Sequence, residues 1–193
     1  MLQDYPYRII LGSASPRRKE LMNMLDVKFE VFPINSDESF TENLISEEIP
    51  LFLSEKKSNA FPRELKENEL LITSDTIVWH RENVLNKPAN YKEAFEMLSS
   101  LSGEIHTVYT GVCIRTTKIT KLFVDSTDVY FRVLEKEEIE YYLENYNPYD
   151  KAGAYGAQDW IGQVGVERIE GSYFNVMGLP VHKVYSVLKE IIS

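Results

Sequence analysis

Cysteine and histidine are scarce in this 193-residue chain, which contains one cysteine and three histidines. The lone cysteine, Cys113, cannot form an internal disulfide, so we expect a reducing compartment and a cytoplasmic protein. His80, His106 and His182 lie far apart in the sequence and lack the spacing of metal ligands. Zinc sites built on cysteine are therefore excluded, and the histidines give no sign of another metal site.

Long hydrophobic runs and an excess of positive charge are also missing. No stretch approaches the ~18 consecutive apolar residues of a membrane helix, and residues 1–6 lack the pattern of a signal peptide. The net charge of −9 argues against a nucleic-acid polymer as partner, because such binding requires a basic face. The negative net charge does not exclude a small polyanionic substrate, because the local basic clusters at 16–19 and 56–57 can make a cleft positive.

What the chain does contain is typical of one globular domain, which we assign to residues 1–193. Hydrophobic residues make up 44% and aromatic residues 12% of the chain, and expected strands alternate with expected helices. This order predicts an α/β fold with a mixed, curved sheet and flanking helices around a cleft. The expected strands cover residues 9–11, 27–34, 70–79, 104–116 and 122–134, and the expected helices cover 16–25, 46–60, 91–101, 135–146 and a last one from 180.

The start of the first expected helix has the features of an anion site. Gly12-Ser13-Ala14 forms a turn of small residues, Ser15 stands at the N-cap position, and Pro16 follows at the first helical position. Backbone N–H groups and the positive end of the helix dipole then meet at one place, where Arg17 and Arg18 add charge. A phosphorylated ligand suits this arrangement. The alternative is an ordinary strand-to-helix turn with solvated arginines.

Two acidic elements stand out. Asp75 interrupts an apolar strand, so its carboxylate must be paired, metal-bound or at a strand end, because burying a bare charge is costly. The alternative is a structural carboxylate that caps a turn. Asp37 and Glu38 form an acidic pair in an expected loop, and such a pair alone is usually solvated. Together with Asp75 they offer oxygen ligands for Mg²⁺ or Mn²⁺.

Further candidates are individually less specific. Lys57 falls in an expected helix, where lysines are commonly on the surface, and Lys87 precedes a proline that favours extended backbone. The segment 150–158 combines charge, two glycines and the amide of Gln158. Its glycines permit either close backbone approach to a ligand or simple turns.

Taken in order and spacing, these segments resemble the Maf family of nucleoside triphosphate pyrophosphatases over nearly the whole chain. The resemblance implies a fold similar to that of inosine triphosphatases, with two lobes around a cleft. It also implies a homodimer as one expected assembly. The segments that carry the resemblance are 13–21, Asp37-Glu38, Lys57, Ser74-Asp75-Thr76, Asn86-Lys87-Pro88, 101–103, 150–156 and 176–180.

Members of the family hydrolyse a nucleoside triphosphate between its α- and β-phosphates with Mg²⁺ or Mn²⁺. This reaction removes unwanted nucleotides from the cellular pool. The resemblance therefore implies that Asp75 accepts the proton of the attacking water or holds the metal, and that Glu38 is the second essential carboxylate. We take both as the expected metal ligands. It further implies that Lys57 and Lys87 neutralise phosphate charge and that Ser13 and Arg18 line the phosphate end.

Three further positions bear on the choice of base. The branch that prefers dTTP and UTP carries Arg, Thr and Gln there, and this chain has Arg17, Thr76 and Gln158. The branch similar to 7-methyl-GTP pyrophosphatases carries Trp, Gln and Glu instead. The chain departs from the common family pattern at Ser74, where Gly or Ala is frequent, and in the less regular loop 156–161.

Two alternatives to a dTTP/UTP pyrophosphatase stay open from the sequence. One is a pyrophosphatase for modified purine nucleotides such as 7-methyl-GTP or ITP. The residues at the three base-selecting positions argue against this alternative. The other is a non-catalytic, nucleotide-sensing regulator of cell division. A sensor does not need both Asp75 and Glu38, so the presence of both carboxylates favours catalysis.

Overall fold

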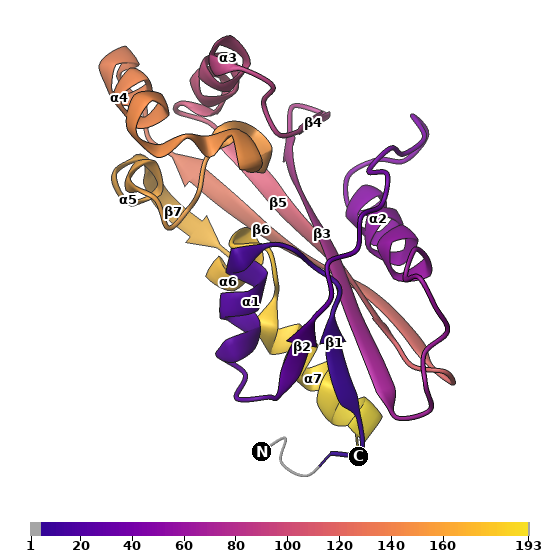
Figure 1. Ribbon diagram of the computed structural model, residues 1–193. Helices are drawn as coiled ribbons and strands as arrows, with labels where there is room; N and C mark the ends of the chain where they lie inside the picture. The colour runs from indigo at the N-terminus through magenta and orange to yellow at the C-terminus, as the bar shows by residue number, and fades with distance from the viewer. Residues whose placement is uncertain (1–4, 193) are drawn as a thin grey trace. The chain divides into compact units, whose positions relative to one another are not determined.

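The computed structural model describes residues 5–192, which form an α/β fold with a seven-stranded sheet (Figure 1). The strand order is β2-β1-β3-β5-β6-β7, and β4 pairs with β3. The strands are β1 (Arg8–Leu11), β2 (Phe29–Val31), β3 (Glu69–His80), β4 (Asn83–Leu85), β5 (Ile105–Arg115), β6 (Thr120–Phe131) and β7 (Val166–Glu170). The helices are α1 (Pro16–Asn23), α2 (Glu48–Asn59), α3 (Tyr91–Leu101), α4 (Lys136–Tyr146), η1 (Pro148–Asp150), η2 (Ala152–Ala154), α5 (Trp160–Gly165), α6 (Tyr173–Val176) and α7 (Val181–Ile192).

The expected mixed sheet is confirmed by the strand directions. Strand β1 pairs in parallel with both β2 and β3, whereas β3–β4 and β6–β7 are antiparallel pairs. Neighbouring strands β5 and β6 are joined by a short turn in which Thr116 N donates to the Ile119 carbonyl at 2.8 Å. So short a connection joins antiparallel strands, and β5 and β6 therefore form a hairpin.

Most expected elements are present with shifted ends, but some predictions were wrong. The strand expected over 27–34 is only Phe29–Val31, partly because Pro33 has no N–H to donate to a sheet. Strands β4 and β7 and helices α5 and α6 were not expected at all. Each has six residues or fewer, which is too short for a hydrophobic period to stand out.

The chain divides into two compact units, in keeping with the two expected lobes. Unit 1 comprises residues 5–75, 110–125 and 178–192, and unit 2 comprises residues 76–109 and 126–177. The strands β3, β5 and β6 contribute residues to both units. A single domain over 1–193 and a cleft stay predictions. None of the helices within residues 5–192 has the length and apolar character that crossing a membrane requires.

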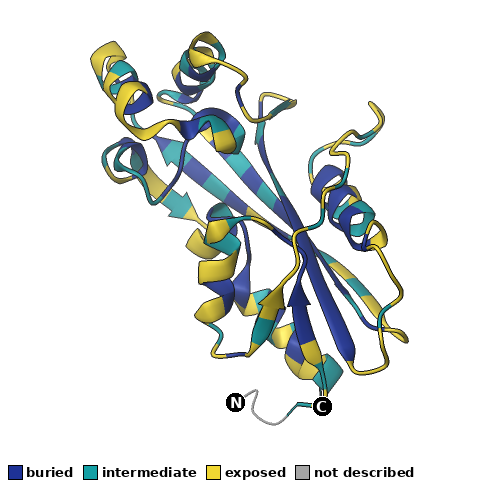
Figure 2. Cartoon of the chain, in the orientation of Figure 1, coloured by how far each residue is buried: buried dark blue, intermediate teal, exposed yellow. Residues whose placement is uncertain are grey.

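The core of unit 1 is built on β1 and the first half of β3, which are buried along most of their length (Figure 2). Residues 9–11 and 70–72 are at most 3% exposed. A continuous apolar run of this kind is typical of parallel strands that are covered on both faces. Helix α1 lies on one side of these strands and α2 on the other in Figure 1.

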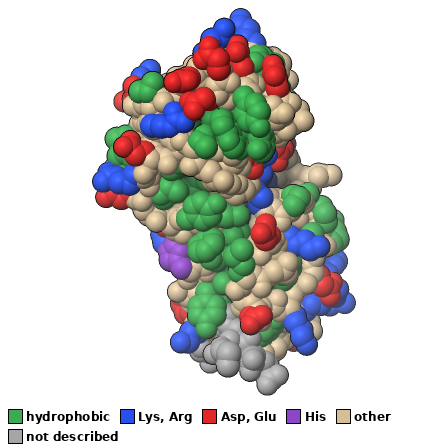
Figure 3. Space-filling view, turned by 90° about the vertical axis from the view of Figure 1, so that its left-hand side faces the viewer, with side chains coloured by type: hydrophobic (Ala, Val, Ile, Leu, Met, Phe, Trp, Pro, Cys, Tyr) green, Lys and Arg blue, Asp and Glu red, His purple; other side chains and the backbone are tan. Residues whose placement is uncertain are grey.

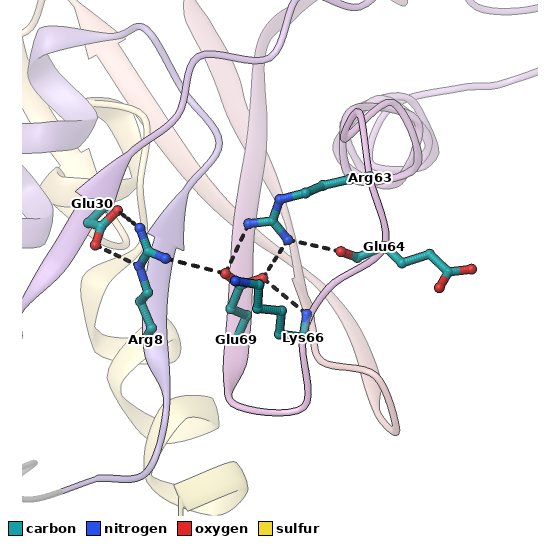
Figure 4. Close-up of polar contacts among 6 residues, drawn as sticks. All are labelled: Arg8, Glu30, Arg63, Glu64, Lys66 and Glu69. Carbon is teal, nitrogen blue, oxygen red and sulfur yellow. Dashed lines mark hydrogen bonds and ion pairs between the residues drawn. The ribbon is translucent and has the colours of Figure 1, made fainter.

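A buried carboxylate, Glu69, fixes the beginning of β3 (Figure 4). Its side chain is 1% exposed and accepts two hydrogen bonds from Arg63, at 2.6 and 2.9 Å. The backbone N–H of Lys66 donates a third at 3.0 Å, and Arg8, which also pairs with Glu30 on β2, lies at 3.6 Å. The hydrogen bonds from Arg63 are the main reason that the pKa of Glu69 falls to about 2. The cluster therefore ties β1, β2 and β3 together at one end.

Helix α2 is attached to the sheet at its beginning, middle and end. An added Cβ at Gly111 on β5 would overlap the backbone of Pro50, so only glycine permits this approach. In the middle of the helix, the hydroxyl of Thr73 donates to the Ser54 carbonyl at 2.7 Å. At the last turn, the Arg115 guanidinium donates to a backbone carbonyl at 2.6 Å. These contacts fix the rotation of α2 and thus the direction of its inner side chains.

Unit 2 has a separate core, in which α3 and α4 pack with aromatic side chains of the strands and loops. The His106 ring nitrogen Nε2 lies 2.7 Å from the Tyr155 hydroxyl, and both rings contact Phe131 edge-on. Burial lowers the pKa of His106 to about 3, so this histidine is neutral and structural at physiological pH. Helix α4 buries the side chains of Ile139, Tyr142 and Leu143 in this core.

Candidate active site

The turn from β1 into α1 has the local structure that the sequence predicted. Ser15 is the N-cap, its hydroxyl accepts the Arg18 N–H at 3.4 Å, and Pro16 occupies the first position of the helix. The backbone N–H of Ser15 donates to the hydroxyl of the buried Ser13 at 3.2 Å. A hydroxyl that accepts in this way still has its own proton to donate. The two serines can therefore donate hydrogen bonds to an anion at the start of α1.

Arg18 is held in place from within unit 1. Its Nε donates to the carbonyl of Gly178 at 2.9 Å, which fixes the plane of the guanidinium. Burial lowers the pKa of Arg18, and the charge of Arg17 acts in the same direction. The carboxylates of Asp75 and Glu38 act against it. Arg18 is therefore close enough to both carboxylates to belong to the same site.

The centre of the site is the ammonium group of Lys57, which lies between two carboxylates. Lys57 Nζ contacts Asp75 Oδ1 directly and lies 3.0 Å from Glu38 Oε1. The exposed fractions of the side chains are 10% for Lys57, 11% for Asp75 and 48% for Glu38. The prediction that Asp75 needs a partner is confirmed. Lys57 is buried, so the alternative of an ordinary surface lysine is wrong.

The neighbouring carboxylate, Asp37, is engaged elsewhere. Its Oδ2 pairs with Lys56 at 3.0 Å, and its Oδ1 accepts the N–H of Ser39 at 3.0 Å. Hydrogen bonds from the Ser39 hydroxyl and N–H, followed by that from Lys56, lower the pKa of Asp37 to about 2. Of the acidic pair, only Glu38 contacts Lys57. The expectation that Asp37 joins Asp75 in one group is therefore wrong.

The remaining predicted residues lie in unit 2. Thr76 follows Asp75 directly on β3 and is half-buried, Lys87 is exposed beyond β4, and Gln158 is half-buried in the segment before α5. Their roles toward a substrate stay predictions. Unit 1 holds the other six: Ser13, Arg17, Arg18, Glu38, Lys57 and Asp75.

The loop that carries Gln158 is held by two residues that the sequence did not single out. The Tyr142 hydroxyl donates to Asp159 at 2.8 Å and accepts the Gly156 N–H at 3.2 Å. An added Cβ at Gly156 would lie 2.6 Å from the Asp159 carboxylate, and one at Gly162 would overlap loop backbone. These two glycines thus make the loop compact. No sequence motif links Tyr142 to Asp159, since only the tertiary packing of α4 brings them together.

The two carboxylates at the centre fit a divalent cation. Mg²⁺ is usually bound by one or two carboxylates together with substrate phosphates and water. Glu38 and Asp75 converge on one point, which Lys57 Nζ occupies. Among residues 5–192, no group of three or more His, Cys, Asp or Glu side chains could hold a metal ion. A cation bound by these two carboxylates would therefore complete its coordination with phosphate and water.

Comparisons with known proteins identify the family of this chain. The family model described as Maf-like protein matches residues 8–191. A protein named dTTP/UTP pyrophosphatase from Bacteroides fragilis is 53% identical over 186 residues, 96% of each chain. One of the same name from Christiangramia forsetii is 51% identical over 197 residues and all of both chains. The solved Ham1 protein of Staphylococcus aureus, 12% identical, matches 95% of this chain and 99% of its own with a TM-score of 0.53, which shows a shared fold. The chain belongs to the Maf family.

Proposed function

We propose that the protein hydrolyses dTTP and UTP to the nucleoside monophosphate and pyrophosphate. The observation that carries the proposal is the buried Lys57 ammonium between the carboxylates of Asp75 and Glu38. Arg18 and the start of α1 add cationic and hydrogen-bonding groups for phosphate oxygens. The name dTTP/UTP pyrophosphatase, given to relatives that are about half identical, supports this choice of substrate.

The chemistry follows from the positions of these groups. Hydrolysis at the α-phosphate needs an oriented water, neutralised phosphate oxygens and a stabilised leaving group. Asp75 orients the water and accepts its proton. Lys57 holds the Asp75 carboxylate in place, and together with Arg18 it matches the negative charge of the transition state. Lys87 is also proposed to neutralise phosphate charge.

Mg²⁺ or Mn²⁺ is the proposed cofactor. Lys57 balances only one of the two carboxylate charges, and a bound triphosphate adds more negative charge, so a divalent cation beside this group would offset the repulsion. Glu38 and Asp75 would hold this cation, which neutralises phosphate charge and makes water more acidic when bound.

The base is proposed to be selected by Arg17, Thr76 and Gln158. The Gln158 amide offers one donor and one acceptor, which suits the imide edge of thymine or uracil. Gln158→Glu replaces the donor by a negative charge, and we expect kcat/KM for dTTP relative to GTP to fall about tenfold.

The matched control for this prediction is Asn145→Asp, the same amide-to-acid change on the exposed face of α4. It should leave the ratio of dTTP to GTP unchanged. Steady-state kinetics with dTTP, UTP, CTP and GTP measure both variants. An unchanged order of preference in Gln158→Glu would remove Gln158 from base selection.

The experiment that tests the function is incubation of the pure protein with dTTP, UTP, CTP, GTP, ITP and 7-methyl-GTP in Mg²⁺ or Mn²⁺. Products are separated by anion exchange. We expect dTTP and UTP to be consumed first. Preference for ITP or 7-methyl-GTP would contradict the base assignment but keep the reaction. Nucleotide binding without turnover would make the protein a sensor.

The assembly and location are also proposals. Hydrophobic side chains are exposed on the face shown in Figure 3, and exposed aromatic residues of unit 2 include Tyr141, Tyr173 and Phe174. The homodimer that the resemblance implies stays a prediction, which light scattering coupled to size exclusion measures. A monomer mass of 22.4 kDa at micromolar concentration would contradict it. A cytoplasmic location likewise stays a prediction.

A further inference from the structure

Lys56, the residue before Lys57 on α2, is bound to both sequence neighbours of Glu38. Its Nζ donates to Asp37 Oδ2 at 3.0 Å, to the Ser39 carbonyl at 2.8 Å and to the Ser39 hydroxyl at 3.3 Å. We call these three residues, Asp37, Ser39 and Lys56, the Lys56 clasp. Its members flank Glu38 on both sides.

The clasp closes the backbone around Glu38. Asp37 Oδ1 accepts the Ser39 N–H at 3.0 Å, and its Oδ2 accepts the Ser39 hydroxyl. This is the turn in which an aspartate bonds to the backbone two residues on. Glu38 lies in the irregular segment between β2 and α2, where no sheet or helix holds the backbone. The clasp thus supplies the order that regular structure does not.

The position of Lys56 is itself fixed from α2. Its ammonium lies 5.9 Å from the centre of the Phe52 ring, one turn earlier on the helix. Successive residues on a helix point about 100° apart, so Lys57 reaches inward to Asp75 while Lys56 reaches the Glu38 loop. One helix therefore both presents Lys57 and determines where Glu38 meets it.

We propose that Lys56 is a positioning residue, which with Asp37 and Ser39 holds the Glu38 carboxylate against Lys57. Its catalytic consequence rests on the proposed function, whereas the ordering of the loop does not. Lys56 makes no contact with the reacting groups in this role and acts only through Glu38.

The test uses Lys56→Gln and Asp37→Asn in the full-length protein, with two readouts. Amide hydrogen exchange of the segment 35–47 should become about two- to fivefold faster, and kcat for dTTP should fall by a similar factor, as expected for loss of one exposed ion pair. The double variant should lose less than the product of the two single effects, because both substitutions remove the ion pair between Lys56 and Asp37. Lys56→Arg, which keeps the positive charge, should show exchange rates and a kcat close to those of the wild-type protein.

The control is Lys121→Gln, which removes an exposed ion pair to Glu190 (2.6 Å) elsewhere in unit 1. This substitution should leave both the hydrogen exchange of the segment 35–47 and kcat for dTTP unchanged. Unchanged exchange in Lys56→Gln would overturn the clasp, and faster exchange with unchanged kcat would overturn its role in catalysis. Absence of turnover by the wild-type protein would instead overturn the proposed function. The wild-type assay gives that result before any variant is made. Hydrogen exchange of the segment 35–47 in the variants still decides whether the Lys56 clasp orders the loop.

Discussion

Asp75→Asn is expected to lower kcat for dTTP by about 10²–10⁴-fold while the protein stays folded. Asparagine has nearly the same shape as aspartate but cannot accept a proton from water. The substitution also removes the negative charge that contacts Lys57, so the ammonium keeps only Glu38 as a carboxylate partner. Steady-state kinetics with saturating Mg²⁺ measure the loss, and thermal unfolding checks the fold.

A buried carboxylate on the same strand provides the matched control. Glu69 lies six residues before Asp75 on β3, which is about 20 Å along a strand. Glu69→Gln should keep the wild-type kcat per folded molecule, although it weakens the fold. Near-normal turnover in Asp75→Asn would remove Asp75 from the mechanism, and equal losses of kcat in both variants would show a general effect of disturbing β3.

Glu69→Gln is expected to lower the free energy of unfolding by about 2 kcal/mol, the size of a hydrogen-bond set to a charged group. For a chain of this length the melting temperature should fall by roughly 4–8 °C. The physical reason is that the Glu69 side chain is 1% exposed and receives its hydrogen bonds from Arg63 and the Lys66 N–H. Glutamine can accept some of these bonds but brings no charge.

The same cluster predicts how stability depends on pH. The pKa of Glu69 is lowered from 4.5 to about 2 in the folded protein, mainly by hydrogen bonds from Arg63. The ionised carboxylate therefore stabilises the fold fully above pH 4.5, and this contribution is lost as pH falls from 4.5 toward 2. Urea unfolding at pH 7, 4 and 3 should show the difference between wild type and Glu69→Gln shrinking at each step. A difference that stays constant would contradict the assignment.

The sequence was sufficient to predict that Asp75 is a special residue. A carboxylate inside an apolar strand must find a partner, whatever the tertiary structure. The start of α1 was equally predictable, because the Ser15 cap and Pro16 act through local backbone geometry. Both predictions depend on residues that are neighbours along the chain.

The partner of Asp75 could not be predicted from pattern alone. Lys57 lies eighteen residues earlier, and its direction depends on how α2 packs against the sheet. That packing is set by distant contacts, such as the close approach of Pro50 to Gly111. Before the resemblance is considered, Lys57 is one of two adjacent lysines on an expected helix.

The residue pattern alone also could not separate Asp37 from Glu38, and only the resemblance singled out Glu38. The two acidic residues are adjacent and chemically alike, and nothing in a loop fixes which one faces inward. The structure separates them through two adjacent lysines, because Lys56 binds Asp37 and Lys57 binds Glu38. The short elements β7 and α6 were missed because five and four residues are too few for a hydrophobic period to stand out.

The most direct test of the central claim is to identify which bond of dTTP the wild-type protein cleaves. Inorganic phosphate and pyrophosphate are quantified separately during a single incubation with Mg²⁺, together with dTMP and dTDP. We expect dTMP and pyrophosphate in equal amounts, with no dTDP at any time. Release of phosphate with dTDP would show attack at the γ-phosphate and would contradict the account of the Asp75, Lys57 and Glu38 site.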